Sequence, residues 1–306
     1  MELKETGQKI VGYGKPHWKM FAASFLFFTI GAAVEPVIPA LFKKLIDSGF
    51  KEGLNYPLWL VPIVIIGLFL IRGAFNFAGN YSMTSSISSV VLDLRRDLMR
   101  GLLPHLPQYL KLVSSTPIRN MGTVAGNFIN GSPIGDLTIM FLALGASITL
   151  LDTAGRTREL ALPDLYLGYK KLAKAADEQV TEISFPAPLA DDFFHFEKVS
   201  KRTHLDIASV NSAVWLRVEN GVIQQARISA GGVGPVPLLL ARTSEFLVGR
   251  ELTAETVLAA NTVMQDEISP ISDVRGTADY KRLLLRQLLW AHFLEFAPEL
   301  AVDELI

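Results

Sequence analysis

Two long apolar runs near the start of the chain constrain its fold more than any other feature. The first, Met20 to Phe42, carries Glu35 as its only charge, and the second, Leu58 to Ala78, carries only Arg72. A helix crosses the hydrocarbon core of a bilayer in about 20 residues, so each run is long enough to span it. The alternative is a pair of buried helices in a large soluble core. The length and apolarity of the runs favour the membrane.

Composition supports this interpretation and excludes several function classes. Hydrophobic residues make up 50% of the 306-residue chain, and the mean hydropathy of +0.32 is higher than is usual for a soluble domain. The net charge of −1 leaves no basic excess for binding nucleic acid. The absence of cysteine excludes disulfides, thiolate zinc sites and Cys-ligated iron–sulfur clusters on this chain. The spacing of His195 and His204 fits no standard ligand pair, so we expect no metal site.

Charges flanking the apolar runs predict an orientation in the membrane. Positive residues precede the first run and follow the second, which mildly favours cytoplasmic termini: Lys4, Lys9, Lys15 and Lys19, then Arg95, Arg96 and Arg100. We therefore expect the hairpin to sit in the inner (plasma) membrane and the rest of the chain to be cytoplasmic. Charged residues inside a membrane span are candidate functional residues, and Glu35 and Arg72 are two such charges. The alternative is that they lie near the ends of the spans, where their side chains reach the interface.

The N-terminal third resembles a known family. Residues of about 5–103 contain PALFKKLIDSGF, LWLVPIVIIGLFLIRGAFNFAGNYSMTSS and VVLDLRRDLMRGLL. In order and spacing these stretches resemble the elbow helix and first two membrane helices of a lipid-exporting ABC transporter. The family's other membrane helices and its nucleotide-binding domain have no counterpart, and no GxxxxGK[ST] loop occurs in the sequence. We therefore expect no ATP hydrolysis of the kind this family performs.

A glycine-rich segment is the most informative stretch in the rest of the chain. Residues 118–136 read IRNMGTVAGNFINGSPIGD and place glycine at positions 122, 126, 131 and 135. Such density lets the backbone adopt positive φ and approach a ligand closely, and the exposed N–H groups can hold phosphate oxygens. A plain glycine-rich turn explains the spacing equally well. The segment is not a Rossmann fingerprint, because no strand and helix frame a GxGxxG motif.

The exact residues of this segment carry a second resemblance. IRNMGTVAGNFINGSPIGD, with FEKVSKRTHLDIASVNSAVWLRVENGVI, ISAGGVGPVPL and ISPISDVRGTADYKRLLLRQLL downstream, is similar to the FAD-carrying subunit of molybdenum hydroxylases such as xanthine dehydrogenase and CO dehydrogenase. The resemblance covers residues of about 104–295. It implies FAD as cofactor, with a molybdopterin-binding subunit and an iron–sulfur subunit as partners. The membrane is a further partner through the hairpin, and nucleic acid is not expected.

The two resemblances together define an expected architecture. The fold class is α+β, with a truncated FAD-binding lobe and a small C-terminal domain of sheet and helices, preceded by an all-α transmembrane helical hairpin. The expected domains are residues 1–103 for the hairpin, 104–190 for the second lobe of the FAD-binding domain, and 191–306 for the C-terminal domain. The family's first FAD lobe, with its own glycine-rich loop, has no counterpart in the sequence, so weak FAD binding is expected.

The resemblance also assigns cofactor contacts. The resemblance implies that the segment after Gly122 contacts the pyrophosphate and that the carboxylate at position 136 hydrogen-bonds the adenosine ribose. It also implies that the valine at position 180 packs on the flavin ring and that a lysine next to Glu197 lies beside the cofactor. These residues are Thr123, Val124, Ala125, Gly126, Asn127, Asp136, Val180 and Lys198. No side chain is an obvious general acid or base, so no catalytic residue is predicted. The redox chemistry would belong to FAD.

Local patterns predict parts of the C-terminal domain independently of any family. Residues 213–219 and 222–229 are strand-like and meet at Asn220-Gly221, the dipeptide that a type I′ hairpin turn favours. Thr253 is a candidate N-cap for the helical pattern that follows it, with Glu255 in the first turn. Residues 279–296 predict a further amphipathic helix.

Three functions remain open at this point. The chain is an FAD-binding oxidoreductase subunit of the xanthine dehydrogenase type, or a fragment of a membrane transporter, or a composite chain with no joint function. Both resemblances are truncated and they abut without a flexible linker. This favours a composite origin over a working fusion, while the functional prediction follows the longer match. Whether the chain acts as an enzyme is left undecided.

Overall fold

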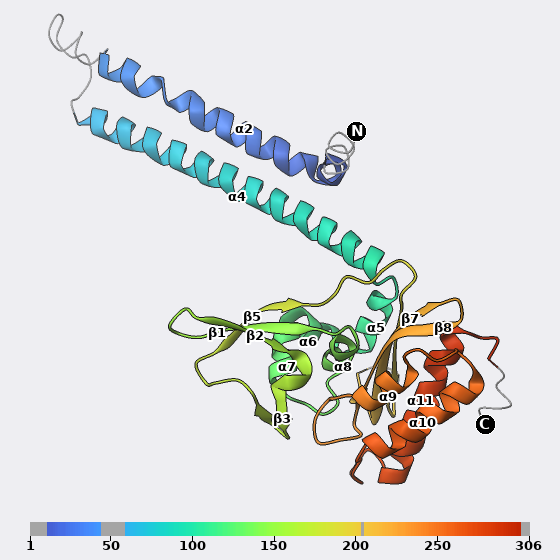
Figure 1. Cartoon of the computed structure of the whole chain (residues 1–306). Coiled ribbons are helices and arrows are strands. Elements are labelled where there is room, and N and C mark those ends of the chain that lie inside the picture. Colours follow the sequence, from blue (N-terminus) through green and yellow to red (C-terminus); the bar gives the residue numbers. More distant parts are fainter. Residues whose placement is uncertain (1–10, 44–58, 203–204, 301–306) are drawn as a thin grey trace, which may run out of the picture. The chain divides into compact units, whose positions relative to one another are not determined.

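The computed structural model describes residues 11–43, 59–202 and 205–300. The chain divides into two compact units, residues 1–99 and residues 100–306 (Figure 1). The domain boundaries expected from the sequence, after residues 103 and 190, remain predictions. His204, one of the two histidines considered for a metal, lies outside the described residues.

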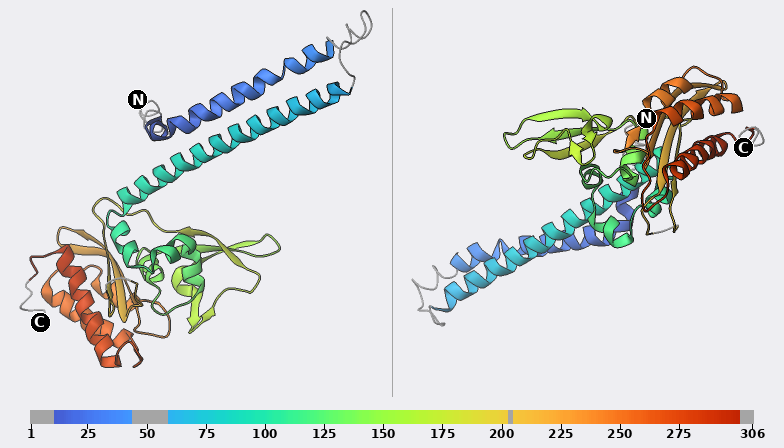
Figure 2. Two further views of the ribbon diagram at one scale, coloured as in Figure 1. Left: turned by 180° about the vertical axis from the view of Figure 1, so that it is seen from behind. Right: turned by 90° about the horizontal axis from the view of Figure 1, so that it is seen from below.

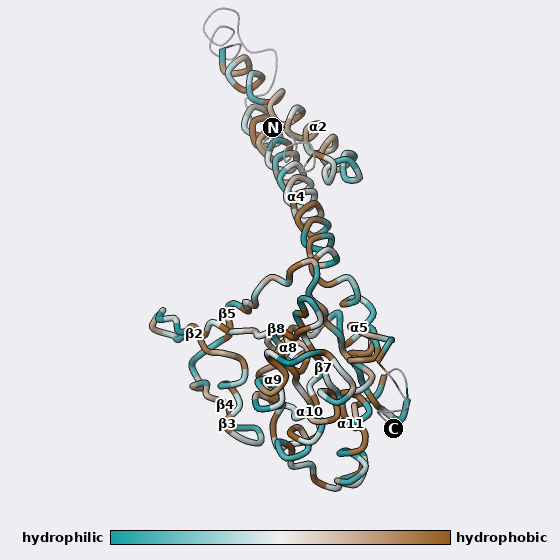
Figure 3. The backbone as a smooth tube through the Cα atoms, turned by 45° about the vertical axis from the view of Figure 1, so that its right-hand side comes forward, coloured by the Kyte–Doolittle hydropathy of each residue, from teal (hydrophilic) through white to brown (hydrophobic). Residues whose placement is uncertain are grey.

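The N-terminal unit is a pair of helices that run side by side (Figures 1 and 2). Helical structure extends from Val11 to Lys43 and from Pro62 to Leu102, and both helices are long and apolar enough to be candidate membrane spans. Only 11% and 6% of their most apolar windows are buried within the structure. Figure 3 shows hydrophobic residues along both helices. Their named elements are η1 (Lys15–His17), α2 (Trp18–Val34) and α4 (Leu60–Leu102).

Close packing and polar contacts join the two helices. The Ser24 hydroxyl donates to the Gly79 carbonyl at 2.8 Å, and a Cβ at Gly79 would lie 2.9 Å from the ring of Phe28. The two charges of the apolar runs, Glu35 and Arg72, form an ion pair with each other. Two charges that would each be costly alone in hydrocarbon are therefore paired across the hairpin.

The first half of the C-terminal unit is a set of short helices followed by a small sheet. The three strands β2-β1-β5 form an antiparallel sheet, and β3 and β4 form a separate ribbon. The elements are α5 (Leu106–Leu112), α6 (Thr116–Met121), α7 (Val124–Ile129), α8 (Asp136–Ala143), β1 (Ser147–Leu151), β2 (Thr157–Ala161), η2 (Leu162–Leu165), β3 (Tyr166–Gly168), β4 (Lys171–Leu172) and β5 (Gln179–Ser184).

The second half is a four-stranded antiparallel sheet with helices. Its strand order is β6-β7-β8-β9, so β6 is an edge strand. The long β7–β8 hairpin turns at Asn220 and Gly221, whose φ values of 52° and 77° confirm the predicted turn. The elements are β6 (Phe193–Val199), β7 (Val210–Glu219), β8 (Val222–Gly231), β9 (Leu238–Leu239), α9 (Ala241–Leu247), α10 (Ala254–Glu267) and α11 (Ala278–Phe296).

Helices cover both faces of this sheet (Figures 1 and 2). Helices α9, α10 and α11 pack on one face around a core that includes Val214, Ile228, Val257 and Phe293. Helix α8 packs on the other face, where the Ser229 hydroxyl donates to the Ile139 carbonyl at 2.7 Å. Alternate residues of a strand point to opposite faces, so each strand presents one set of side chains to α11 and another to α8.

The helix starts follow the sequence signals. The Thr253 side chain accepts a hydrogen bond from the Thr256 amide and begins α10, as predicted. Thr277 does the same for α11 through the Tyr280 amide. The fold class is thus confirmed: a mixed helix-and-sheet unit preceded by apolar helices.

Candidate cofactor site

The glycine-rich segment folds as helices α6 and α7, a turn and the start of α8, and not as an open loop. Of its four glycines only Gly131 has a positive φ, at 57°, so the expectation of repeated positive φ is wrong. The others are needed mainly for space. A Cβ at Gly126 would lie 2.9 Å from the Thr123 hydroxyl, and one at Gly135 would lie 3.0 Å from Asn127 Oδ1.

Thr123 is the N-cap of α7, because its hydroxyl accepts a hydrogen bond from the Gly126 amide at 2.9 Å. The amides of Val124 and Ala125 occupy the first turn of the helix. The first amides of a helix have no partner within it, and within the described chain these two make no other hydrogen bond. The predicted pyrophosphate residues therefore include two amides that remain available to an acceptor.

Asn127 fixes α7 against α8. Its Oδ1 accepts hydrogen bonds from both the amide and the hydroxyl of Thr138, at 3.2 and 3.1 Å. A Cβ at Gly135 would press on the same oxygen. The predicted pyrophosphate and ribose residues are thus held in one rigid arrangement.

Asp136 is the first residue of α8 and the centre of a buried polar cluster. Its Oδ2 accepts a hydrogen bond from Lys198 Nζ at 2.7 Å, and its Oδ1 accepts one from Asn211 Nδ2 at 2.6 Å. The side chains of Asp136 and Lys198 are only 10% and 3% exposed. Lys198 also donates to the Leu112 carbonyl at 2.9 Å. Burial raises the pKa of Asp136, and the Lys198 ammonium and Asn211 amide offset part of that increase.

A cavity of about 370 Å³ opens beside this cluster, and we call it the Asp136 pocket. Its lining includes the polar residues Ser115, Asn127 and Asp136, while Leu205 and Ile207 contribute apolar surface. The full lining is Val113, Ser114, Ser115, Ile118, Asn127, Asn130, Ser132, Ile134, Gly135, Asp136, Leu205, Asp206, Ile207, Ala208 and Arg275. A lining of polar and apolar side chains suits a ligand that has both polar groups and flat apolar rings.

Two lining residues have strained backbones. Ser114 and Leu205 have φ values of 49° and 60°, a region that costs a residue with a Cβ about 1–2 kcal/mol. Both lie at this pocket, and Leu205 is 62% exposed although it is apolar. Strain of this kind concentrates at ligand sites, which supports a binding role for the pocket.

The structure places the predicted contacts in three groups. Thr123, Val124, Ala125, Gly126 and Asn127 form the cap and first turns of α7, and Asp136 and Lys198 form an ion pair. Val180 lies on β5 and pairs with Leu150. Of the eight residues, Asn127 and Asp136 line the Asp136 pocket and the other six do not.

Sequence reasoning missed Asn211, which holds the second oxygen of Asp136. Its amide also donates to the Ile134 carbonyl at 3.3 Å, and the residue is fully buried in β7. A signal was present, because Asn211 is a polar residue inside the strand-like run IASVNSAVWL. A buried amide in such a run needs hydrogen-bond partners, and here these are in the glycine-rich segment.

Three family models match the chain. Residues 86–188 match the FAD binding domain in molybdopterin dehydrogenase, and residues 195–296 match the CO dehydrogenase flavoprotein C-terminal domain. Residues 21–105 match the ABC transporter transmembrane region. The first and third matches overlap over residues 86–105, which are the last part of α4 and the three residues after it.

Individual relatives agree with these matches. The chain is 30% identical over 192 residues to the nicotinate dehydrogenase FAD-subunit of Eubacterium barkeri, covering 61% of this chain and 64% of that one. It is 43% identical over 96 residues to the ATP-dependent lipid A-core flippase of Thiobacillus denitrificans, covering 31% of this chain and 16% of that one. The solved structure of a Cu,Mo-CO dehydrogenase matches with a TM-score of 0.60 and 30% identity, covering 63% of this chain and 67% of that one.

The C-terminal two thirds of the chain, residues 86–296, therefore belong to the FAD-binding subunits of molybdenum hydroxylases, and both resemblances stated above are confirmed. The N-terminal helices match the ABC transporter transmembrane region and are similar to that part of the flippase. The chain spans less than two thirds of the nicotinate dehydrogenase subunit and a small part of the flippase.

The residues present fit the family's cofactor. FAD carries a pyrophosphate, hydroxyl groups and flat rings. The Asp136 pocket offers the carboxylate of Asp136 and apolar surface at Leu205 and Ile207. Helix α7, whose Asn127 lines the pocket, begins with the free amides of Val124 and Ala125. The space kept open by Gly126 and Gly135 would be lost to any larger side chain.

Proposed function

We propose that this chain is the FAD-binding subunit of a membrane-associated molybdenum hydroxylase. The observation that carries the proposal is the Asp136 pocket. Asn127 of the capped helix α7 and Asp136, which Lys198 and Asn211 hold in place, line this one cavity, and both lie in the segment that matches the FAD-binding family. When bound, FAD would supply the redox chemistry, and the chain's own residues would bind and orient it.

Each side chain has a distinct role in this proposal. The amides of Val124 and Ala125, kept in place by the Thr123 cap, hydrogen-bond the pyrophosphate. Asp136 accepts a hydrogen bond from the ribose, because each carboxylate oxygen retains a lone pair beyond its one protein donor. Lys198 and Asn211 keep that carboxylate in one orientation. Val180 packs on the flavin ring from β5.

The partners are part of the proposal. The E. barkeri relative is named as one subunit of a dehydrogenase, and a relative from Hydrogenophaga pseudoflava is a carbon monoxide dehydrogenase medium chain. A molybdopterin-binding subunit would carry out the hydroxylation. Since this chain has no cysteine, any cluster held by thiolates belongs to another subunit. The hairpin anchors the assembly to the inner membrane, with the C-terminal unit on the cytoplasmic side.

We expect the affinity for FAD to be weak. The family surrounds FAD with two glycine-rich lobes, and only the second has a counterpart in these 306 residues. Each lost hydrogen bond to a charged phosphate forfeits about 1.5–3 kcal/mol. Several such losses weaken binding by orders of magnitude, because about 1.4 kcal/mol corresponds to a tenfold change.

Equilibrium titration with FAD tests the proposal. Quenching of flavin fluorescence should saturate with the wild-type chain, and Asp136→Ala and Gly126→Val should both weaken it. The valine displaces the Thr123 hydroxyl that caps α7. Gly168→Val is the matched control, because a Cβ there meets nothing within 4 Å. Binding that survives both test substitutions would place the site elsewhere.

The transporter reading is the second candidate, and the 43% identity of the hairpin to a lipid A-core flippase favours it. Under this hypothesis the chain is a transporter fragment and its C-terminal unit has no function of its own. Under a third hypothesis the chain is a composite whose two parts have no joint function. FAD binding at the Asp136 pocket would count against the transporter hypothesis, and co-purification of a molybdopterin-containing partner would count against both hypotheses.

A further inference from the structure

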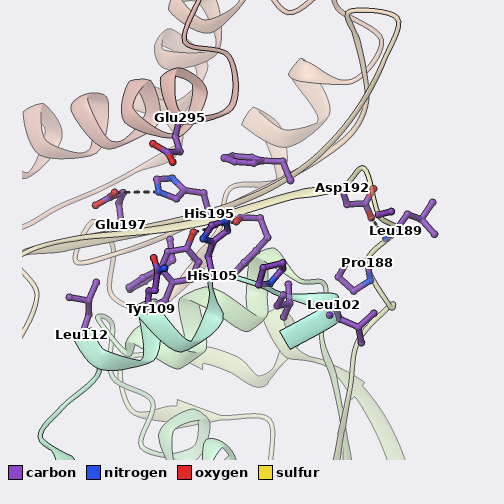
Figure 4. Close-up of a pocket in the computed structure, with 18 residues that line it drawn as sticks. Leu102, His105, Tyr109, Leu112, Pro188, Leu189, Asp192, His195, Glu197 and Glu295 are labelled. Carbon is purple, nitrogen blue, oxygen red and sulfur yellow. Dashed lines mark hydrogen bonds and ion pairs between the residues drawn. The ribbon is translucent and has the colours of Figure 1, made fainter. Parts of the chain in front are cut away.

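A second and larger cavity lies within the C-terminal unit along the edge strand β6. Its volume is about 780 Å³, in the range of small-molecule sites. Its walls come from residues 101–105, helix α5, the segment before β6, β6 itself and the end of α11. Figure 4 shows its side chains, and none of them takes part in the Asp136 pocket.

The charge of this cavity is negative. Its lining includes three carboxylates and no lysine or arginine. Arg217 neutralises Asp192 through contacts of 2.7 and 2.9 Å and lies outside the lining. Glu197 contacts only the imidazole of His195, at 3.3 Å, and Glu295 makes no ion pair or hydrogen bond in the described chain. Two carboxylates therefore lack a cationic partner.

The walls of the cavity are aromatic. Tyr109 packs edge-on against Phe194, His195 and Phe196, with ring centroids 5.9 to 6.0 Å apart. Phe193 lies 5.8 Å from His195, and His105 lies 6.4 Å from Tyr109. Because β6 is an edge strand, rings on both of its faces reach the same cavity. In Figure 4 Glu197 and Glu295 are drawn on either side of the His195 ring.

We propose that this cavity binds a small organic cation with an alkylammonium head. Ammonium groups are attracted both by carboxylates and by the faces of aromatic rings within about 6 Å. An anion would meet Glu197 and Glu295 with no basic residue in the lining, and an apolar ligand would leave both carboxylates without a counter-charge. The site is distinct from the FAD site and does not depend on the function proposed above.

His195 lies next to one of the two carboxylates. Its Nε2 is 3.3 Å from Glu197 Oε1, and its Nδ1 lies 2.8 Å from Nδ1 of the fully buried His292. A cation bound at Glu197 would therefore lie beside the His195 ring, and this ring can report on binding.

The test is calorimetric titration of the full chain, in detergent, with benzyltrimethylammonium. We expect saturable one-to-one binding that weakens about three- to tenfold in Glu295→Gln and in Glu197→Gln, the loss expected for one partly exposed charge contact. Glu299→Gln is the matched control, since this exposed acid is on the same segment outside the lining. The His195 ring resonances should shift on binding.

Two results would overturn the proposal. They are no binding at millimolar concentration and equal affinity in the Glu295→Gln and Glu299→Gln variants. A lysine-rich peptide that binds where benzyltrimethylammonium does not would identify a protein-docking surface and would also overturn it. Circular dichroism of each variant establishes that the fold is retained.

Discussion

Replacing Lys198 with methionine tests the buried polar cluster on which the candidate cofactor site depends. The change keeps most of the side-chain volume and removes the ammonium that Asp136 contacts at 2.7 Å. With exposures of 10% and 3%, neither side chain can turn to water without moving β6 or α8. Asp136 would keep only Asn211 as a partner, and the Leu112 carbonyl would lose its donor.

The expected loss is large because a buried pair is broken on one side only. Removing one partner of such a pair costs about 3–5 kcal/mol. We expect about 3 kcal/mol, near the lower end of that range, because Asn211 still donates to Asp136 and the carboxyl group can take up a proton. For a unit of this size each kcal/mol moves Tm by about 2–4 °C, so Tm should fall by about 6–12 °C.

The pH dependence has a definite sign. Burial already raises the pKa of Asp136, and without Lys198 that pKa rises further. A carboxyl group whose pKa is higher in the folded state does not destabilise the fold while it is protonated in both states. Its destabilising effect grows as the pH rises from the unfolded-state pKa to the folded-state pKa and is complete above the folded-state pKa. The gap in Tm between wild type and Lys198→Met should therefore be small near pH 4 and full near pH 7.

Thermal unfolding followed by near-ultraviolet circular dichroism, at pH 4 and pH 7, measures this gap. Lys171→Met is the matched control, because Lys171 is exposed on β4, and it should leave Tm unchanged. Adding Asp136→Asn to Lys198→Met should restore part of the loss. A shift of less than 2 °C at pH 7, or an equal shift at both pH values, would refute the reasoning.

Three further outcomes are expected. Burial and the neighbouring His195 hold the pKa of His292 well below its ordinary value. The free energy of unfolding should therefore fall as the pH drops below about 6.5, by up to about 1.4 kcal/mol per pH unit. In denaturant titrations His292→Gln should flatten this dependence, and an unchanged slope would contradict the assignment. Gly79→Val should destabilise the helical hairpin by about 1–3 kcal/mol in micelles, because its side chain would meet Phe28, whereas Gly67→Val, which meets nothing within 4 Å, should not. The full chain should stay in the membrane fraction after an alkaline wash, and recovery of monodisperse protein without detergent would disprove the span assignment.

Local signals predicted much of the fold. The turn at Asn220-Gly221 and the cap at Thr253 depend on residues adjacent in sequence, and both were read correctly. The apolar runs were recognised as helices for the same reason, because length and composition are local properties. The glycine-rich segment was located correctly, but its conformation was not. Most of its glycines make room for neighbouring side chains and do not need positive φ.

Contacts between distant residues could not be read from local patterns. Lys198 and Asn211 lie 62 and 75 residues from Asp136, and the packing of α8 on the four-stranded sheet brings the three together. His195 and His292 are 97 residues apart, so no spacing rule would have paired them. The negative charge of the larger cavity along β6 likewise arises from the fold. The fold places Glu197 and Glu295 in the lining of this cavity, and the lining contains no lysine or arginine.

Hydrogen–deuterium exchange with and without saturating FAD tests the central claim most directly, because it locates the cofactor on the chain. The account predicts slower exchange in residues 114–136 and in residues 205–211 when FAD is present, with no change in α10. Asp136→Ala should abolish that protection at the same FAD concentration. Unchanged exchange at saturating FAD, or protection confined to segments outside the Asp136 pocket, would contradict the assignment of this pocket as the FAD site.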